Sequence, residues 1–186
     1  MTTVSNGRNR VRIIGGQWRS RIVKFPAAAQ LRPTPDRVRE TLFNWLGQRL
    51  DGCACLDLFA GSGALGFEAM SRGADRVVMV ESDRAVAAGL RATALELEAA
   101  GLEVKEGDAL TFLKRPREKF DLVFLDPPFA SDLAARALKS LPAHLNAGAR
   151  VYIEGPEAFA ASEPWRVLRE DRAGTVRYAL LELTTP

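Results

Sequence analysis

The sequence predicts an α/β fold built on a mostly parallel sheet with helices on both faces. After residue 52, strand-like apolar runs alternate with segments whose apolar residues recur at helical spacing, which is typical of such a sheet. A glycine-rich loop follows the first strand, and the strand at 120–125 ends in two prolines that cannot continue it. Ligands of open α/β sheets bind beyond the carboxyl ends of strands, so both places are candidates for a functional site.

The expected elements follow one another with short connections. Thr34 is expected to cap a helix whose first residue is Pro35 and which runs to about residue 50. Asp83 and Asp108 are expected to cap two later helices. Strands are expected at 53–58, 76–80, 102–106, 120–125 and 149–153, with helices at 63–72, 83–100, from 108 onward and at 131–142. Segments 165–170 and 175–183 predict a closing hairpin that adds an antiparallel edge.

Composition restricts the class of protein. The chain has 186 residues, 47% of them hydrophobic and 26% charged, which is typical of a globular domain. No apolar run approaches the roughly 18 residues that a membrane span needs. Residues 1–10 lack the apolar core of a signal peptide, so we expect a cytoplasmic protein. Cys53 and Cys55 are expected to be small buried strand residues, and His144 is given no catalytic role.

Basic residues are concentrated near the N-terminus. The first 35 residues hold seven basic side chains and no acidic one; since the whole chain has a net charge of +3, residues 36–186 have a net charge of −4. Strand-like residues on both sides of Gly15-Gly16 predict a hairpin there. We therefore divide the chain into a basic arm with a hairpin, 1–30, and a main domain, 31–186, and expect the arm to bind nucleic acid. The candidate contacts are Arg8, Arg10, Arg12, Arg19, Arg21 and Lys24, with Arg37 on the following helix.

The loop after the first strand is suited to a cofactor that contains a nucleoside. Residues 61–66 form the G-x-G-x-x-G pattern of dinucleotide-binding proteins, and Glu81 ends the next strand. Asp57, on the strand before the loop, would repel a pyrophosphate but suits a cationic amino-acid group. Asp108, after the third strand, can meet an adenine amino group. These two acids favour S-adenosylmethionine over a dinucleotide.

Three segments together resemble the class I methyltransferases that act on amino groups. They are Asp57-Leu58-Phe59-Ala60-Gly61-Ser62-Gly63, then Glu81, then Asp126-Pro127-Pro128-Phe129. The segments 12–19 and 32–46 narrow the resemblance to the RsmD family of small-subunit ribosomal RNA guanine-N2 methyltransferases, and the resemblance covers residues 11 to about 155. It implies a Rossmann-like fold whose seven-stranded sheet has an antiparallel last strand. It also implies S-adenosylmethionine as cofactor, S-adenosylhomocysteine as product, and ribosomal RNA within a small subunit or its assembly intermediate as partner.

The resemblance gives each of these residues a role. Asp126 and the carbonyl group of Pro127 would each accept one N–H of the guanine amine, Pro128 would stiffen the turn, and Phe129 would stack on the base. The cofactor-binding residues would be Asp57, Phe59, Ala60, Gly61, Ser62, Gly63, Glu81, Asp83, Asp108 and Ala109. Of these, the loop would hold the methionine end, Glu81 the ribose and Asp108 the adenine. We expect that the activity needs no metal. We also expect that the protein is a monomer.

Three other functions stay open from the sequence. A DNA amino-methyltransferase would carry the same D-P-P-F tetrad, and the basic arm does not exclude it. An NAD-binding oxidoreductase would explain the glycine spacing but would have no use for the tetrad. A non-enzymatic RNA-binding module would use the arm alone. Binding of S-adenosylmethionine measured against NAD separates the last two functions from the methyltransferases.

Overall fold

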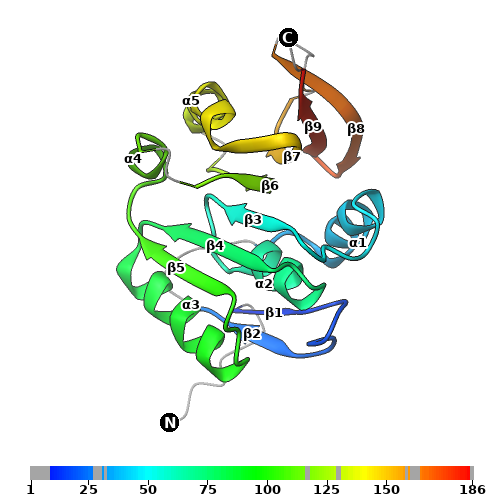
Figure 1. The fold of residues 1–186 in the computed structure, drawn as a ribbon. Helices are drawn as coiled ribbons and strands as arrows, with labels where there is room; N and C mark the ends of the chain where they lie inside the picture. Colours follow the sequence, from blue (N-terminus) through cyan, green and yellow to red (C-terminus); the bar gives the residue numbers. More distant parts are fainter. Residues whose placement is uncertain are drawn as a thin grey trace.

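A seven-stranded sheet forms the centre of the molecule, and a separate two-stranded hairpin lies outside it (Figure 1). The structure is a computed structural model that describes residues 9–26, 31, 33–115, 118–128, 131–157, 159 and 164–184. The strand order of the large sheet is β5-β4-β3-β6-β7-β9-β8, in which β9 runs antiparallel to both neighbours and the strands from β5 to β7 are parallel. The expected mostly parallel sheet with an antiparallel last strand is confirmed.

The elements occur in the predicted order. The large sheet contains β3 (Ala54–Asp57), β4 (Arg76–Glu81), β5 (Leu102–Glu106), β6 (Phe120–Leu125), β7 (Leu145–Gly155), β8 (Trp165–Ala173) and β9 (Val176–Leu183). The helices are α1 (Asp36–Trp45), α2 (Ala64–Ser71), α3 (Arg84–Glu96), α4 (Ala109–Leu113), α5 (Leu133–Ser140) and the 3₁₀ helix η2 (Leu141–His144). The predicted hairpin consists of β1 (Arg10–Arg12) and β2 (Ile22–Lys24).

Several predicted details are wrong. Helix α1 ends at Trp45, short of residue 50, because Gly47 and Gln48 both have positive φ and turn the chain away. Thr34 does not cap this helix; its hydroxyl donates instead to Oε1 of Glu154, 3.1 Å away. Helix α3 likewise ends at Glu96, before residue 100. Strand β7 begins at residue 145 rather than 149, with a register shift in its pairing to β6.

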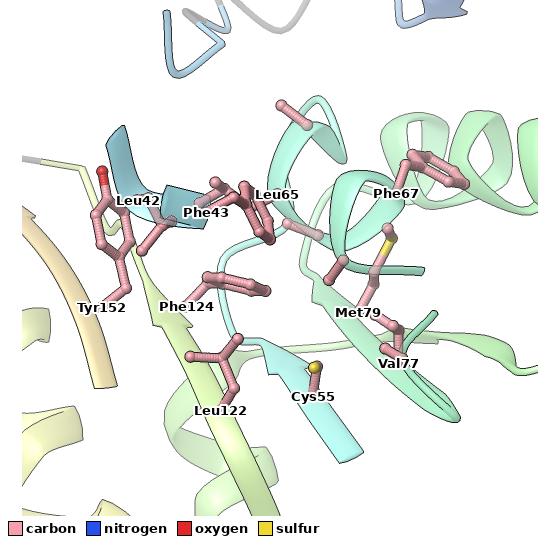
Figure 2. Close-up of a cluster of buried hydrophobic side chains, with 14 of the residues drawn as sticks. Leu42, Phe43, Cys55, Leu65, Phe67, Val77, Met79, Leu122, Phe124 and Tyr152 are labelled. Carbon is pink, nitrogen blue, oxygen red and sulfur yellow. The ribbon is translucent and has the colours of Figure 1, made fainter. Parts of the chain in front are cut away.

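Two groups of helices cover the large sheet. Helices α1, α2 and α3 lie on one face, where Phe43, Phe67, Phe124 and Tyr152 belong to one apolar cluster (Figure 2). Helices α4 and α5 cover the other face over a second cluster that includes Val123 and residues of both helices. Among the described residues, no helix is long and apolar enough to cross a bilayer. Because helices cover both faces of the sheet, the loops surround the carboxyl ends of the parallel strands.

The turn of the hairpin docks on the last residue of α2. The N–H of Gln17 donates to the carbonyl oxygen of Ser71 (2.7 Å), and the Ser71 hydroxyl donates to the carbonyl oxygen of Gly15 (2.6 Å). Gly16 has a φ of +74°, and a Cβ there would lie 1.8 Å from the Ser71 carbonyl oxygen. Only glycine permits this approach, so the turn is fixed at the carboxyl-terminal end of α2.

A buried ionic network fastens the hairpin to the main domain. Glu68 of α2 is fully buried and accepts hydrogen bonds from Arg39 Nη1 (3.0 Å) and Arg72 Nε (2.8 Å). The same carboxylate accepts the backbone N–H of Ile14 (2.9 Å), and Arg39 Nη2 donates to the carbonyl oxygen of Arg12 (2.8 Å). The hairpin backbone therefore completes the hydrogen bonding of charges that lie in the core.

Candidate active site

Acidic side chains gather at the carboxyl ends of four neighbouring parallel strands. Asp57 is the last residue of β3, Glu81 is the last of β4, Asp126 follows β6, and Glu154 lies one residue before the end of β7. Strand β3 pairs with both β4 and β6, and β6 pairs with β7, so the four residues share one edge of the sheet. The direction of strand order reverses between β3 and β6, which is where open α/β sheets bind ligands.

The loop after β3 is tied to β4. The N–H of Ala60 donates to the carbonyl oxygen of Val80 (3.0 Å), and the N–H of Gly61 donates to Oε2 of Glu81 (2.9 Å). The other oxygen of Glu81 accepts the N–H of Asp83 (2.7 Å). A carboxylate has about four acceptor positions, so two bonds leave capacity for the hydroxyl groups of a ribose.

The rest of the loop turns directly into α2. Gly63 is the N-cap residue of the helix, and its N–H donates to the carbonyl oxygen of Ala60 (2.7 Å). The Ser62 hydroxyl accepts the N–H of Ala64 (3.4 Å), and Phe59 packs against the apolar cluster under α4 and α5. The predicted loop residues therefore form one compact turn at the acidic edge.

Asp57 is a buried carboxyl group with one hydrogen bond. Its residue is 3% exposed, and Oδ2 accepts the N–H of Gly66 (3.1 Å). Burial raises the pKa of Asp57 to about 7, although the Gly66 hydrogen bond lowers it and the negative charge of Glu81 raises it further. A Cβ on Gly66 would lie 2.4 Å from Cε of Met79 and 3.2 Å from Oδ2 of Asp57. The third glycine of the pattern thus lets α2 approach the strands and meet this carboxyl group.

Asp126 stands at the end of β6 before two prolines. The residue is half-buried, Pro127 is buried and Pro128 is exposed. The Ser131 hydroxyl donates to the carbonyl oxygen of Pro128 (2.6 Å), which closes the turn. Phe129, the fourth residue of the predicted tetrad, lies outside the described residues. The strand end and the proline turn lie where the sequence predicts them.

The charges that act on this edge are negative. Burial raises the pKa of Asp126 well above its ordinary value, and the charges of Glu154 and then Asp57 raise it further. In the part of the chain that the structure describes, no basic side chain shifts the pKa of Asp57 or Asp126. Such an edge suits a ligand with a positive sulfonium and ammonium group and opposes the pyrophosphate of a dinucleotide. The residues present therefore fit S-adenosylmethionine.

Asp83 and Asp108 both cap helices, as predicted. Oδ1 of Asp83 accepts the N–H groups of Ala85 and Val86 in the first turn of α3 (2.8 and 3.0 Å). Oδ1 of Asp108 accepts the N–H of Thr111 in the first turn of α4 (2.7 Å). The hydrogen bonds with Thr111 lower the pKa of Asp108. Both carboxylates are exposed, and Ala109, the first residue of α4, is buried. Each carboxylate keeps a second oxygen for a ligand.

Glu154 and the two side chains that hold it, Tyr152 and Thr34, are site residues that the sequence pattern did not predict. Glu154 is 6% exposed, and its Oε1 accepts the hydroxyl groups of Tyr152 (2.8 Å) and Thr34 (3.1 Å). Thr34 lies just before α1, whereas Tyr152 and Glu154 lie on β7. One signal was available: a carboxylate at the end of an apolar strand is costly to bury unless it has partners.

The cysteines and the histidine lie outside this edge. Both cysteines are free, and burial raises the pKa of the Cys55 thiol. His144 is buried, with Nε2 3.1 Å from the carbonyl oxygen of Leu113 and its ring stacked on Phe112. Within the described ranges, no group of three or more His, Cys, Asp or Glu residues is arranged to hold a metal ion.

The basic residues predicted to bind nucleic acid are exposed on the hairpin and on α1. Arg10 pairs with Lys24 across the hairpin, on the side opposite the buried Val11 and Val23. Arg12 also lies on this exposed side, and its Nη2 is 3.2 Å from Oδ2 of Asp36. The remaining exposed candidates are Arg19 and Arg21 at the turn and Arg37 on α1, whereas Arg8 lies outside the described residues. The turn lies at the opposite end of α2 from Gly63, and so from the acidic edge.

Comparisons with known proteins agree with this geometry. The family model described as "Conserved hypothetical protein 95" matches residues 11–182. Ribosomal RNA small subunit methyltransferase D of Escherichia coli K12 is 42% identical over 182 residues, which cover 95% of this chain and 92% of that protein. The solved structure of Escherichia coli yhhF has a TM-score of 0.86 at 41% identity, over 94% of this chain and 98% of that one. Thermus thermophilus RsmC, a 16S rRNA N2 G1207 methyltransferase solved with AdoMet and guanosine, shares the fold (TM-score 0.70, 24% identity, 94% of this chain and 49% of that one).

The sheet topology and the acidic edge define a class I methyltransferase with a Rossmann-like fold. The chain belongs to the family whose model is described as "Conserved hypothetical protein 95", which is the RsmD family that its N-terminal segments resemble. The membership removes two of the functions left open by the sequence, the oxidoreductase and the non-enzymatic RNA-binding module.

Proposed function

We propose that this methyltransferase transfers a methyl group from S-adenosylmethionine to the exocyclic N2 of a guanine in small-subunit ribosomal RNA. The observation that carries the proposal is the position of Asp126, a carboxyl group at the switch point of the sheet, followed by two prolines and beside an edge suited to a cation. The name of the 42% identical Escherichia coli relative supports the RNA substrate. We further propose that the protein acts as a monomer in the cytoplasm, on a small subunit or its assembly intermediate.

The cofactor would lie along the acidic edge. When bound, S-adenosylmethionine supplies a methyl group on a positively charged sulfur atom. Asp57 and the loop from Phe59 to Gly63 would bind its methionine end, and Glu81 would accept the ribose hydroxyl groups. The exposed side of Asp108, with Ala109 beneath it, would meet the adenine, and Asp83 would supply a second acceptor near the ribose.

The residues of the β6 turn would prepare the amine for attack. The exocyclic amine of guanine is a poor nucleophile because its lone pair is delocalised into the ring. Asp126 and the Pro127 carbonyl would each accept one N–H, which favours a tetrahedral nitrogen and localises the lone pair. When the nitrogen receives the methyl group, Asp126 would take the proton that the amine loses and pass it to water. The cofactor would leave as S-adenosylhomocysteine, with the electron pair of the broken S–C bond on sulfur. Such orientation lowers a barrier by up to about 7–11 kcal/mol.

The target base must leave its helix to reach this turn. Pro128 would keep the turn stiff, and Phe129 would stack on the guanine, an interaction worth about 1–3 kcal/mol. We propose that residues 1–30 supply much of the RNA affinity and residues 31–186 the chemistry. Arg8, Arg10, Arg12, Arg19, Arg21, Lys24 and Arg37 would contact phosphates, since they are exposed or precede the hairpin.

The experiment that tests the proposal is methyl transfer to small subunits from cells that lack the gene. The purified chain and S-adenosylmethionine are added, and the ribosomal RNA is mapped by mass spectrometry before and after. We expect one methyl group to appear on N2 of a guanine. Protein-free ribosomal RNA and duplex DNA are tested in parallel, the first to identify the substrate form and the second to test the DNA alternative. Methylation of DNA alone would overturn the proposal.

A further inference from the structure

A second carboxylate lies beside Asp126 at the site. The last registered pair of β6 and β7 is Leu125 with Ile153, so Asp126 and Glu154 are the next residues across the two strands. Residues opposite each other on neighbouring strands point to the same side of a sheet, and the strands are about 4.8 Å apart. The charge of Glu154 is also the largest charge effect on the pKa of Asp126. The edge therefore presents two carboxyl groups side by side.

Glu154 is held by one of its two oxygens. Oε1 accepts the hydroxyl groups of Tyr152 and Thr34, while the described residues give Oε2 no hydrogen bond. The ring of Tyr152 is in turn fixed in the core, edge-on to Phe124 with centroids 6.4 Å apart (Figure 2). The carboxylate is thus fixed from the side of the protein, and Oε2 is the oxygen left for a ligand.

We propose that Glu154 accepts the N1–H of the target guanine and so selects guanine over bases that lack this donor. The inference rests on the proposed function, whose site it shares. The Watson–Crick edge of guanine presents N1–H and the N2 amine side by side, so two adjacent carboxylates match its two adjacent donors. Asp126 would accept an N–H of the N2 amine, and Glu154 would accept the N1–H of the ring. A purine with an acceptor at N1 would set its lone pair against a carboxylate and be repelled.

The alternative role for Glu154 is indirect. Its charge could serve only to keep a proton on Asp126, in which case replacing it would alter the rate for every amine substrate by the same factor. A recognition role predicts instead that the preference between two bases changes. The two roles are therefore separated by base preference and not by overall activity.

The test compares guanosine 5′-monophosphate with 2-aminopurine riboside 5′-monophosphate, which keeps the amine at C2 but has an acceptor at N1. Binding to the full chain with saturating S-adenosylhomocysteine is followed by 2-aminopurine fluorescence and by competition with the guanine nucleotide. The parent should prefer guanine by about ten- to hundredfold, the discrimination of a well-placed hydrogen-bonded pair. In Glu154→Gln the new amide can donate to N1 of 2-aminopurine, so the preference should vanish or reverse.

Matched tyrosine variants control for general effects. Tyr152→Phe removes one of the two bonds that hold Glu154 and should reduce the preference for guanine, whereas Tyr178→Phe removes a hydroxyl that donates to Asp171 (3.0 Å) and should keep it. Thr34→Val should act like Tyr152→Phe. The thermal midpoint and the cofactor affinity of Glu154→Gln will show whether this variant folds. If it does not fold, Tyr152→Phe and Thr34→Val still test whether Glu154 recognises the base.

Two results would overturn the inference. One is a folded Glu154→Gln protein with the same base preference as the parent. The other is a parent that methylates small subunits but shows no preference for guanosine 5′-monophosphate over the analogue. Each nucleotide is tested up to about 10 mM, which is near the weakest dissociation constant that such a site would give. A parent that prefers the guanine nucleotide but leaves small subunits unmodified would contradict the proposed function and not the role of Glu154.

Discussion

Among single residues, the carboxyl groups of the acidic edge stand out because burial opposes their charge. Asp57 has a pKa of about 7 in the folded protein against 3.8 as its ordinary value, and the pKa values of Asp126 and Glu154 are also raised by burial. A positive ligand that reaches these groups replaces the missing solvation and favours the ionised form. Ligand binding and proton release are therefore linked at this edge.

The affinity for S-adenosylmethionine should rise with pH until about pH 7 and then level off. Below that value Asp57 holds a proton in the free protein, and binding the cation must displace it, at a cost of up to about 1.4 kcal/mol per pH unit. Calorimetry in buffers of different ionisation enthalpy measures both the affinity and the proton released. Asp57→Asn should bind more weakly and show a smaller pH dependence. Equal affinity of the parent at about pH 6 and about pH 8 would contradict this account.

The same raised pKa should affect the stability of the free protein. Between the unfolded value of 3.8 and the folded value of about 7, the folded state holds a proton on Asp57 that the unfolded state has lost, so the free energy of unfolding should fall as pH rises. In Asp57→Asn this part of the decline should disappear. Denaturant unfolding at several pH values measures it, and a variant with the same slope as the parent would assign the decline to other groups.

Replacing Asp126 should separate catalysis from cofactor binding. Asp126→Ala should keep the affinity for S-adenosylmethionine within several-fold and lose at least about a hundredfold in methyl transfer, because the carboxylate that accepts the amine proton is gone. Single-turnover transfer to small subunits measures the loss. Asp132→Ala, an exposed residue before α5, is the control and should behave like the parent. A folded Asp126→Ala protein with near-normal turnover would remove this residue from the mechanism.

Among the secondary-structure elements, α2 has two separate tasks. Its first turn follows the glycine loop and meets Asp57, whereas Glu68 and Ser71, near its end, hold the hairpin. Arg39 and Glu68 are both 0% exposed and lie 3.0 Å apart, so each charge is balanced by protein partners instead of water. The orientation of the basic hairpin is therefore set by the same helix that positions the cofactor loop.

Removing Glu68 should be costly. Glu68→Ala removes the carboxylate that two buried arginines share. Arg39 keeps its bond to Asp36 (2.6 Å), whereas Arg72 keeps no acidic partner among the described residues and the N–H of Ile14 is left unpaired, so we expect a loss of about 3–5 kcal/mol in the free energy of unfolding. Chemical denaturation measures the loss. Asp51→Ala, which breaks the exposed pair with Arg49, should leave stability close to the parent value. A small effect of Glu68→Ala would mean that water enters and solvates the two arginines.

The regular elements could be predicted because their signals are local. Glycine and proline mark the ends of β3 and β6, and Asp83 and Asp108 cap the helices that they precede in the sequence. The bond between Thr34 and Glu154 could not be predicted, because it joins residues 120 positions apart and is made only when α1 packs beside β7. For the same reason Thr34 resembles a helix cap in sequence yet has another partner. The local pattern of residues 34–36 is equally consistent with a helix cap and with a bond to a distant carboxylate.

Across the whole molecule, the site and the hairpin turn lie at opposite ends of α2 (Figure 1). The helix between them has eight residues and is about 12 Å long. An RNA that places a guanine at Asp126 and reaches the turn must therefore run along the hairpin side. Arg10 and Lys24 lie on the exposed side of the hairpin strands and form the pair that is farthest from the turn.

Removing the two arginines at the turn should test this path. Arg19→Ala/Arg21→Ala should weaken RNA binding and make its dependence on salt shallower, by about 0.7–0.9 in the log–log slope for each phosphate that the variant no longer binds. Cofactor affinity should not change, because the turn docks at the end of α2 that lies away from the glycine loop. Deleting residues 1–10 should have a smaller effect of the same kind. Arg136→Ala/Arg166→Ala, which removes two exposed arginines elsewhere, is the matched control and should leave the slope unchanged. A turn variant with the affinity and slope of the parent would show that RNA reaches the site without touching the turn.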